Sequence, residues 1–167
     1  MAKKILPENL PTSLPKPKKE EQEFGPGKRD VLVCPECNAV YFYKSWHHRL
    51  EDYPHLKENK DVRFKLCPAC IMIKNGKFEG EVIIENLDGK NITDLINTIK
   101  NMGDSAIKRD NQDRIIKIKE KENKIRVITT ENQLAQKIAN KIKKTFNFKN
   151  LEIKYSKGES VVRARLS

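Results

Sequence analysis

The stretches Cys34-Pro35-Glu36-Cys37 and Cys67-Pro68-Ala69-Cys70 decide how the first half of this chain folds. Together they contain all four cysteines of the 167-residue protein, and 29 residues separate them. Two thiolates at this spacing can reach one ion, and two such pairs supply the four ligands of a tetrahedral Zn²⁺ site. The sequence therefore predicts one structural zinc ion with Cys34, Cys37, Cys67 and Cys70 as its ligands.

The cysteines have two alternative interpretations, as structural disulfides or as a redox dithiol. Prolines interrupt the N-terminus and nothing there resembles a secretory signal, so we expect a cytosolic protein, where structural disulfides are rare. A thioredoxin-like dithiol is one C-x-x-C at the start of a helix and does not need a second copy. No apolar run approaches the ~20 residues of a membrane span, so we expect no membrane partner.

No catalytic pattern accompanies the cysteines. The chain has no glycine-rich phosphate loop, no G-x-S-x-G and no H-E-x-x-H, and no His-x-Glu precedes the second cysteine pair as a zinc deaminase would require. Four thiolates also leave no open position on the metal for a substrate. We interpret His47, His48 and His55 as surface or supporting residues, and expect a non-enzymatic protein without a small-molecule substrate.

The net charge of +11 is the second informative feature, and it is unevenly distributed. Basic and acidic residues number seven and four in residues 1–29, eight and seven in 30–79, and nineteen and twelve in 80–167. The excess of +7 (nineteen minus twelve) in the last segment favours a polyanionic partner such as RNA. The alternative is a solubilising surface in an organism whose genome favours Lys, Asn and Ile codons.

Composition divides the chain into three segments. Residues 1–29 contain five prolines and many charges, which predicts a disordered tail. Residues 30–79 form the predicted zinc module, with strands at 31–33, 39–43 and 63–66, a short helix and loop over 46–59, and a helical turn at 71–76. We expect a small core around the metal, and the sequence leaves a zinc ribbon and a treble clef both open. The aromatic residues of that core are Tyr41, Phe42, Tyr43, Trp46, Tyr53 and Phe64.

Residues 80–167 alternate between strand and helix periodicity in the order β-α-β-β-α-β, with one further strand at the end. Asn91 is the expected N-cap of the first helix, which Gly103 weakens or ends. Thr130 and Gln133 have the spacing of a capping box for the second helix. This order predicts an α+β, ferredoxin-like domain with two helices on one face of an antiparallel sheet. The expected strands are 81–85, 114–119, 124–129, 151–155 and 161–166.

Strand alternation assigns side chains to the two faces of this sheet. Toward the helices we expect Ile116, Ile118, Ile125, Val127, Ile153, Tyr155, Val162 and Ala164. On the open face we expect the candidate nucleic-acid-binding residues Lys117, Lys119, Arg126, Lys154, Arg163 and Arg165. Like charges on neighbouring strands repel, so a polyanion would relieve a cost there. A solvated lysine-rich face is the alternative.

Base-specific reading by stacked aromatic residues is not expected on this face. The strands lack the basic-Gly-aromatic signature of an RNA-recognition motif, and Tyr155 is assigned to the helix side. A second basic patch on the last helix is interpreted as the solvated face of that helix. It consists of Lys137, Lys141, Lys143 and Lys144.

The run Cys34-Pro35-Glu36-Cys37-Asn38-Ala39-Val40-Tyr41, with the second knuckle and Gly80, resembles the N-terminal zinc-binding region of the ribosomal large-subunit export adapter family. Thr129-Thr130, Leu134-Ala135 and Val162-Arg163-Ala164-Arg165 resemble elements of its small archaeal and bacterial relatives. The resemblance covers about residues 30–167. It implies a zinc-binding, non-enzymatic protein that contacts the large ribosomal subunit. That family's zinc region has more metal-binding cysteines, so we infer one zinc ion here, and nuclear export does not carry over.

We therefore expect a cytoplasmic zinc-binding adapter for ribosomal RNA or a ribonucleoprotein such as the large ribosomal subunit. One alternative is a zinc-dependent regulator that binds DNA or a protein partner. Another is a thiol redox switch or metal-trafficking protein, which would need exposed cysteines of low pKa.

Overall fold

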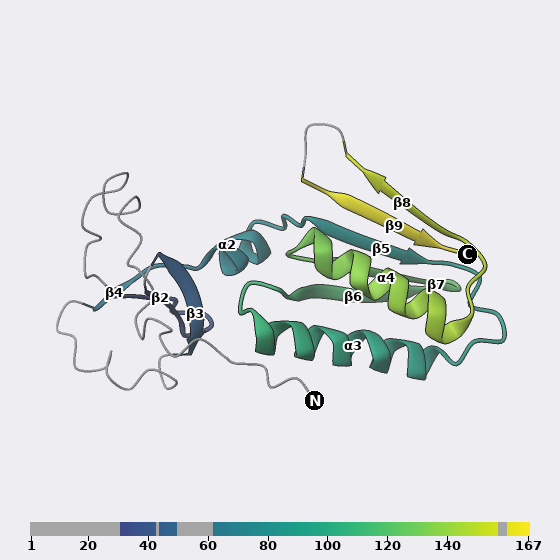
Figure 1. The fold of residues 1–167 in the computed structure, drawn as a ribbon, viewed down its shortest axis with the longest axis horizontal. Coiled ribbons are helices and arrows are strands. Elements are labelled where there is room, and N and C mark those ends of the chain that lie inside the picture. Colours follow the sequence, from purple (N-terminus) through teal and green to yellow (C-terminus); the bar gives the residue numbers. More distant parts are fainter. Residues whose placement is uncertain (1–30, 43, 50–61, 157–159) are drawn as a thin grey trace, which may run out of the picture.

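The computed structural model describes residues 31–42, 44–49, 62–156 and 160–167, which form two β-sheets and three helices (Figure 1). The elements of the cysteine unit, residues 31–79, are β1 (Val31–Val33), β2 (Ala39–Phe42), β3 (Ser45–Arg49), β4 (Val62–Phe64) and α2 (Pro68–Lys74). The elements of the C-terminal unit, residues 80–167, are β5 (Gly80–Ile84), α3 (Ile92–Arg109), β6 (Ile115–Lys121), β7 (Lys124–Thr129), α4 (Asn132–Phe146), β8 (Leu151–Tyr155) and β9 (Val162–Leu166).

The cysteine unit contains a four-stranded sheet in the order β3-β2-β1-β4. A helix was expected from Trp46, and that prediction is wrong, because β3 occupies this position. Lys44 has a φ of 61°, a left-handed conformation that turns the chain back so that β3 pairs antiparallel with β2. The rings of Tyr41 and Trp46 then lie across the hairpin with centroids 5.5 Å apart. The remainder of the expected helix and loop, 50–59, lies outside the described residues.

The second cysteine pair begins a helix. Cys67 is the N-cap of α2, and its Sγ accepts a hydrogen bond of 3.4 Å from the backbone N–H of Cys70. Pro68 fits the first turn because its missing N–H would have no partner there. The helix ends at Asn75, followed by Gly76 with a φ of 64°, as the Asn-Gly pair predicted. A knuckle that leads into a helix is the arrangement we associate with a treble clef rather than a zinc ribbon.

The C-terminal unit has the expected element order but a different sheet. Its five strands lie in the order β6-β7-β5-β9-β8, and β5 pairs with β9 in parallel. The sheet is therefore mixed rather than antiparallel, and the last strand stands between β5 and β8. Burial accounts for this placement: Val162, Ala164 and Leu166 of β9 are at most 1% exposed, whereas Tyr155 of β8 is 67% exposed, as an edge strand allows.

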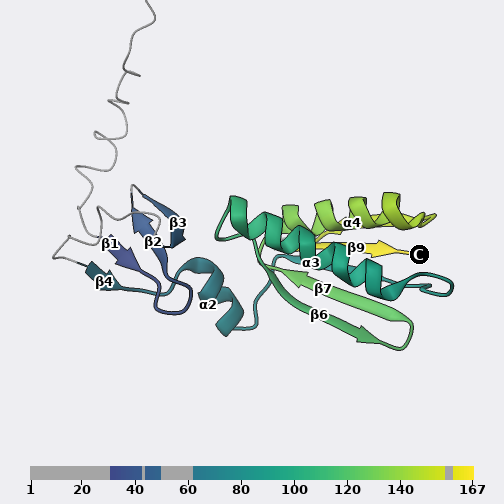
Figure 2. The same ribbon diagram turned by 90° about the horizontal axis from the view of Figure 1, so that it is seen from below.

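Both long helices cover the same face of this sheet (Figure 2). Asn91 caps α3 as predicted, since its side chain accepts a hydrogen bond from the N–H of Asp94. The helix does not end at Gly103 but continues to Arg109. A Cβ at Gly103 would lie 2.6 Å from Cδ1 of Ile115, so the glycine allows α3 to pack closely on β6. No helix in the described part of the chain is long and apolar enough to cross a membrane.

The expected capping box of α4 is wrong. The N-cap is Glu131, and no side chain caps this helix. The hydroxyl of Thr130 instead donates to the carbonyl of Gln112 at 2.6 Å and accepts from the N–H of Arg114 at 2.8 Å. Thr130 therefore fastens the loop before β6 to the end of β7.

Two assignments of strand faces need correction. The register of β6 shifts between Ile115 and Lys117, so Ile115 and Ile118, rather than Ile116, pack against the core. Tyr155 lies on the helix side, but it is exposed and its hydroxyl contacts Gln136 of α4 at 3.4 Å. The other expected inward residues of this sheet, Ile125, Val127, Ile153, Val162 and Ala164, are buried or pack against the core.

Candidate functional site

The four predicted ligands come together from two turns. Cys34 follows β1, and the turn through Cys37 closes at Asn38, whose left-handed φ of 59° matches the expectation for that position. Cys67 and Cys70 lie at the start of α2. Their four Sγ atoms all lie within 4.8 Å of one another, and every residue except Cys37 is buried.

The spacing of these sulfur atoms fits a tetrahedral metal site. Sulfur ligands ~2.3 Å from a zinc ion would be about 3.8 Å apart along the edge of a tetrahedron. The Sγ atoms of Cys37 and Cys67 are 3.7 Å apart. All four thiols are free, and 3.7 Å is far longer than the ~2.05 Å of a disulfide bond. The residues present therefore fit one metal ion held by four sulfurs.

Histidine is not part of this group in the described residues, because the clustered metal-ligating side chains are the four cysteines alone. His47 and His48 lie on β3 and are partly buried, while His55 is outside the described residues. Trp46 packs against the cysteines, as expected. Phe64 was expected in the same core but is 74% exposed. Phe42, Tyr43 and Tyr53 of that core carry side chains that are not described.

Burial and backbone hydrogen bonds act in opposite directions on the thiols. Burial raises the pKa of Cys34, but backbone N–H groups of Cys67, Cys37 and Glu36 oppose it and bring the pKa to about 7. Burial raises the pKa of Cys67 and of Cys70, and the neighbouring cysteines raise that of Cys70 further. Four adjacent thiolates therefore need a cation among them. A divalent metal ion that replaces the four thiol protons would supply that positive charge.

Arg114, the residue immediately before β6, lies against this cluster. Its Nη2 donates to Sγ of Cys37 at 3.1 Å, and its Nη1 donates to Sγ of Cys70 at 3.4 Å. Its Nε donates to the backbone carbonyl of Asn111 at 2.6 Å, which fixes the plane of the guanidinium. Burial opposes the charge of Arg114, but the contact with Cys37 and the other thiols raises its pKa. The arginine offsets part of the charge of about −2 that four thiolates and one Zn²⁺ would carry.

The loop that carries Arg114 also binds the helix that carries two cysteines. The backbone N–H of Ala69 donates to Oε1 of Gln112 at 3.0 Å, and Asn111, only 7% exposed, accepts from Arg114 through its side chain. The cysteine cluster thus lies where the two units meet. Sequence analysis missed this set, because Arg114 is 44 positions from Cys70 and 77 from Cys37, and no local pattern marks such a contact.

The six candidate nucleic-acid-binding residues lie on the sheet face opposite the helices. In each strand they alternate with the residues that face the helices, so their side chains lie on the other face. All six are exposed. They span four strands: Lys117 and Lys119 on β6, Arg126 on β7, Arg163 and Arg165 on β9, and Lys154 on β8.

Repulsion among these cations is smaller than the sequence suggested, because glutamates lie among them. Glu81 of β5 is bound by Arg126 at 2.5 Å and by Arg163 at 3.2 Å. Arg165 lies 4.0 Å from Glu85. On the edge strand, Lys154 pairs with Glu152 at 2.9 Å. These glutamates therefore already relieve part of the repulsion that a polyanion was expected to relieve.

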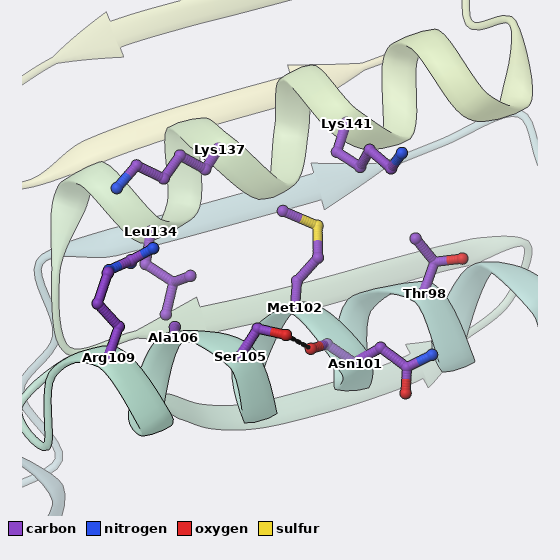
Figure 3. A pocket seen from close by; sticks show the side chains of 9 residues that line it. All are labelled: Thr98, Asn101, Met102, Ser105, Ala106, Arg109, Leu134, Lys137 and Lys141. Carbon is purple, nitrogen blue, oxygen red and sulfur yellow. Dashed lines mark hydrogen bonds between the residues drawn. The ribbon is translucent and has the colours of Figure 1, made fainter.

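The opposite surface carries a separate groove between α3 and α4, with a volume of 370 Å³ (Figure 3). Met102, Ala106 and Leu134 form its apolar part, and Lys137 and Lys141 line it from α4. The hydroxyls of Thr98 and Ser105 already donate to carbonyls of their own helix. Arg109, at one end, is paired with Asp113 at 3.1 Å. This groove contains no cluster of metal-ligating groups among the described residues.

No protein-family model and no curated protein matches this chain. The relationship to the ribosomal export adapter family is therefore a prediction from the motifs alone.

Proposed function

We propose that this protein is a non-enzymatic, cytoplasmic zinc-binding adapter that binds ribosomal RNA or a ribonucleoprotein through a basic surface. The observation that carries the proposal is the cysteine cluster, whose four sulfurs converge and are contacted by Arg114 of the C-terminal unit. In this interpretation the metal stabilises the small cysteine unit and holds it against the C-terminal unit, which we take to be an elaborated ferredoxin-like domain.

The donor set supports a structural zinc ion. Four sulfurs complete a tetrahedron and leave no position for substrate, and tetrahedral sulfur sites in proteins hold zinc or iron. Three of the four cysteines are buried, which disfavours a thiol switch because reactive cysteines are accessible. Arg114, partly buried beside the sulfurs, would support the metal ligands through its hydrogen bonds to Cys37 and Cys70.

The charge of the chain supports a polyanionic partner. The net charge is +11, and the six sheet-face cations exceed the three glutamates among them, Glu81, Glu85 and Glu152, by three. Within the described residues, Lys117 and Lys119 have no ion pair, so both are available to phosphate. The motif resemblance to the ribosomal export adapter family is consistent with contact to the large ribosomal subunit.

Salt-dependent RNA binding tests this function. We expect the wild-type protein to bind labelled single-stranded RNA, with an affinity that falls steeply as salt rises. The variant Lys117→Glu/Lys119→Glu should weaken binding, whereas Lys137→Glu/Lys141→Glu makes the same charge change on the opposite surface and should have a smaller effect. Co-sedimentation with ribosomal subunits at low salt should place the protein with the large subunit.

Three results would contradict the proposal. Absence of RNA binding at low salt removes the function altogether. Equal effects of the two double variants show that net charge, and not the sheet face, controls the affinity. Tight binding to duplex DNA without binding to RNA supports the zinc-dependent regulator instead.

A further inference from the structure

Glu81 is the most buried charged group on the open sheet face. Its side chain is 8% exposed, although it lies on the face that no helix covers. It binds Nε of Arg126 through Oε1 at 2.5 Å and Nε of Arg163 through Oε2 at 3.2 Å. The two arginines cover it while remaining half exposed themselves, at 50% and 48%.

Strand register explains this arrangement. Glu81 pairs directly with Arg163 on the parallel strand β9, and on β7 the residue diagonal to Glu81 is Arg126, which pairs with Ile83. Central strand β5 thus supplies one carboxylate between one arginine on each side. Two residues beyond Ile83, Glu85 lies in the same way between Lys124, at 2.9 Å, and Arg165, at 4.0 Å.

The contacts to Glu81 leave the outer edges of the arginines available. An arginine has five N–H donors in a planar fork, and each carboxylate contact here uses the Nε side. Among the described residues, both terminal nitrogens of Arg126 have no hydrogen-bond partner, and its guanidinium also lies 5.8 Å from the ring centroid of Phe78. Arg163 uses Nη1 for the hydroxyl of Ser156 and keeps Nη2. A buried carboxylate therefore fixes two guanidinium planes whose remaining donors lie at the exposed surface.

The two terminal nitrogens of Arg126 suit the paired oxygens of a phosphodiester, which arginine binds bidentately and lysine does not, and Nη2 of Arg163 adds a further donor. The orientation has already been fixed by Glu81, so less side-chain entropy is lost when a phosphate binds. Lys117 and Lys119 on the neighbouring strand β6 extend this positive surface, so that it could contact further phosphates of the same RNA strand. The two arginines retain a net positive charge because a single carboxylate serves both of them.

We propose that Glu81, Arg126 and Arg163 form a preorganised phosphate-binding site for the backbone of single-stranded RNA. The arginines contact phosphate, and Glu81 is a positioning residue that does not. This inference rests on the proposed RNA-binding function and identifies the groups that perform it. It also separates the site from a merely basic surface, in which Glu81 would only subtract from the positive charge.

The test uses the full chain and fluorescence anisotropy with a labelled single-stranded RNA. Arg126→Lys/Arg163→Lys keeps the net charge and should weaken binding about tenfold, because the fork geometry is lost. Arg109→Lys is the matched control, since Arg109 is also a half-exposed arginine paired with a carboxylate, but on the groove side. It should leave the affinity unchanged. Urea denaturation of each variant confirms that it is folded.

The sign of the effect of Glu81→Gln is the sharper readout. Removal of a negative charge strengthens RNA binding if the surface acts through charge alone. Binding should weaken instead if the carboxylate positions the two arginines. Glu152→Gln is the control for charge, because Glu152 is exposed and pairs with Lys154 rather than with an arginine, and it should strengthen binding slightly.

Three outcomes overturn the inference. Tighter RNA binding by Glu81→Gln, or unchanged binding by Arg126→Lys/Arg163→Lys, would refute this site. The proposed function would still stand as long as the wild-type protein binds RNA. Wild-type protein that binds anionic lipid vesicles but not RNA removes both.

Discussion

Replacement of Arg114 by methionine should weaken zinc binding while leaving all four sulfur ligands in place. Methionine keeps much of the side-chain volume but removes the donors to Cys37 and Cys70, which lie at 3.1 and 3.4 Å. A hydrogen bond to a charged group contributes about 1.5–3 kcal/mol, and partial exposure of Arg114 reduces that contribution. Supporting residues of metal sites typically change affinity 10–100-fold, so we expect about 30-fold, or ~2 kcal/mol.

The assay is competition for zinc with a chromophoric chelator of known affinity. Trp46 provides a second signal, because it is the one tryptophan of the chain and packs against the cysteines. Arg114→Lys should fall between wild type and Arg114→Met, since it restores the charge but not the two-pronged contact. Arg109→Met controls for the lost positive charge. The reasoning is refuted if Arg114→Met keeps an affinity within about twofold of wild type, against the 10–100-fold range expected.

Three further predictions concern the fold around the site. Gly80→Ala should lower the free energy of unfolding by about 2–3 kcal/mol in urea, because the new Cβ would lie 2.5 Å from Cβ of Ala135 and 2.8 Å from the carbonyl of Glu131; a loss below ~0.5 kcal/mol would contradict the close approach of β5 to α4. Burial, followed by the charges of Glu79, Asp113 and Asp110, raises the pKa of Glu131. Its carboxyl therefore binds a proton more tightly in the folded state, and the stability of the fold falls as the pH rises from the unfolded pKa of Glu131 through its raised folded pKa. Glu131→Gln should therefore be more stable than wild type at neutral pH, with a gain that shrinks toward acid pH, whereas a pH-independent difference would refute the assignment. Chelation of the metal should accelerate amide hydrogen exchange over residues 110–114, which contact the cysteine unit, while the amides of β9 stay protected. If chelation leaves the exchange rates of residues 110–114 unchanged, the two units are not coupled through the metal site.

Local sequence patterns were sufficient for much of the fold. The alternation of apolar residues in β7 and the helical spacing of Leu134, Ile138 and Ile142 in α4 each depend on one face meeting the core, so they can be read within a short window. The cysteine spacing was equally direct, because both pairs place their sulfurs by local turn geometry. The Asn91 cap followed for the same reason.

Features that depend on pairing between distant segments could not be read this way. Strands β8 and β9 show similar alternation, and only the packing around Ala164 shows that β9 lies beside β5. The strand that carries Glu81 was predicted, but the partners of Glu81, Arg126 and Arg163, follow only once the register is known. The contact of Arg114 with the cysteines needs the relative placement of two units and has no local signature at all.

The most direct test of the central claim is the metal content of the purified protein, measured by mass spectrometry together with a count of free thiols. Four convergent sulfurs predict one zinc ion per chain, and thiols that react with a disulfide reagent only after the zinc is chelated. Cys34→Ser should lose most of the zinc and shift the Trp46 fluorescence toward that of an unfolded cysteine unit. A folded wild-type chain that contains no zinc, or contains iron in its place, would contradict the account.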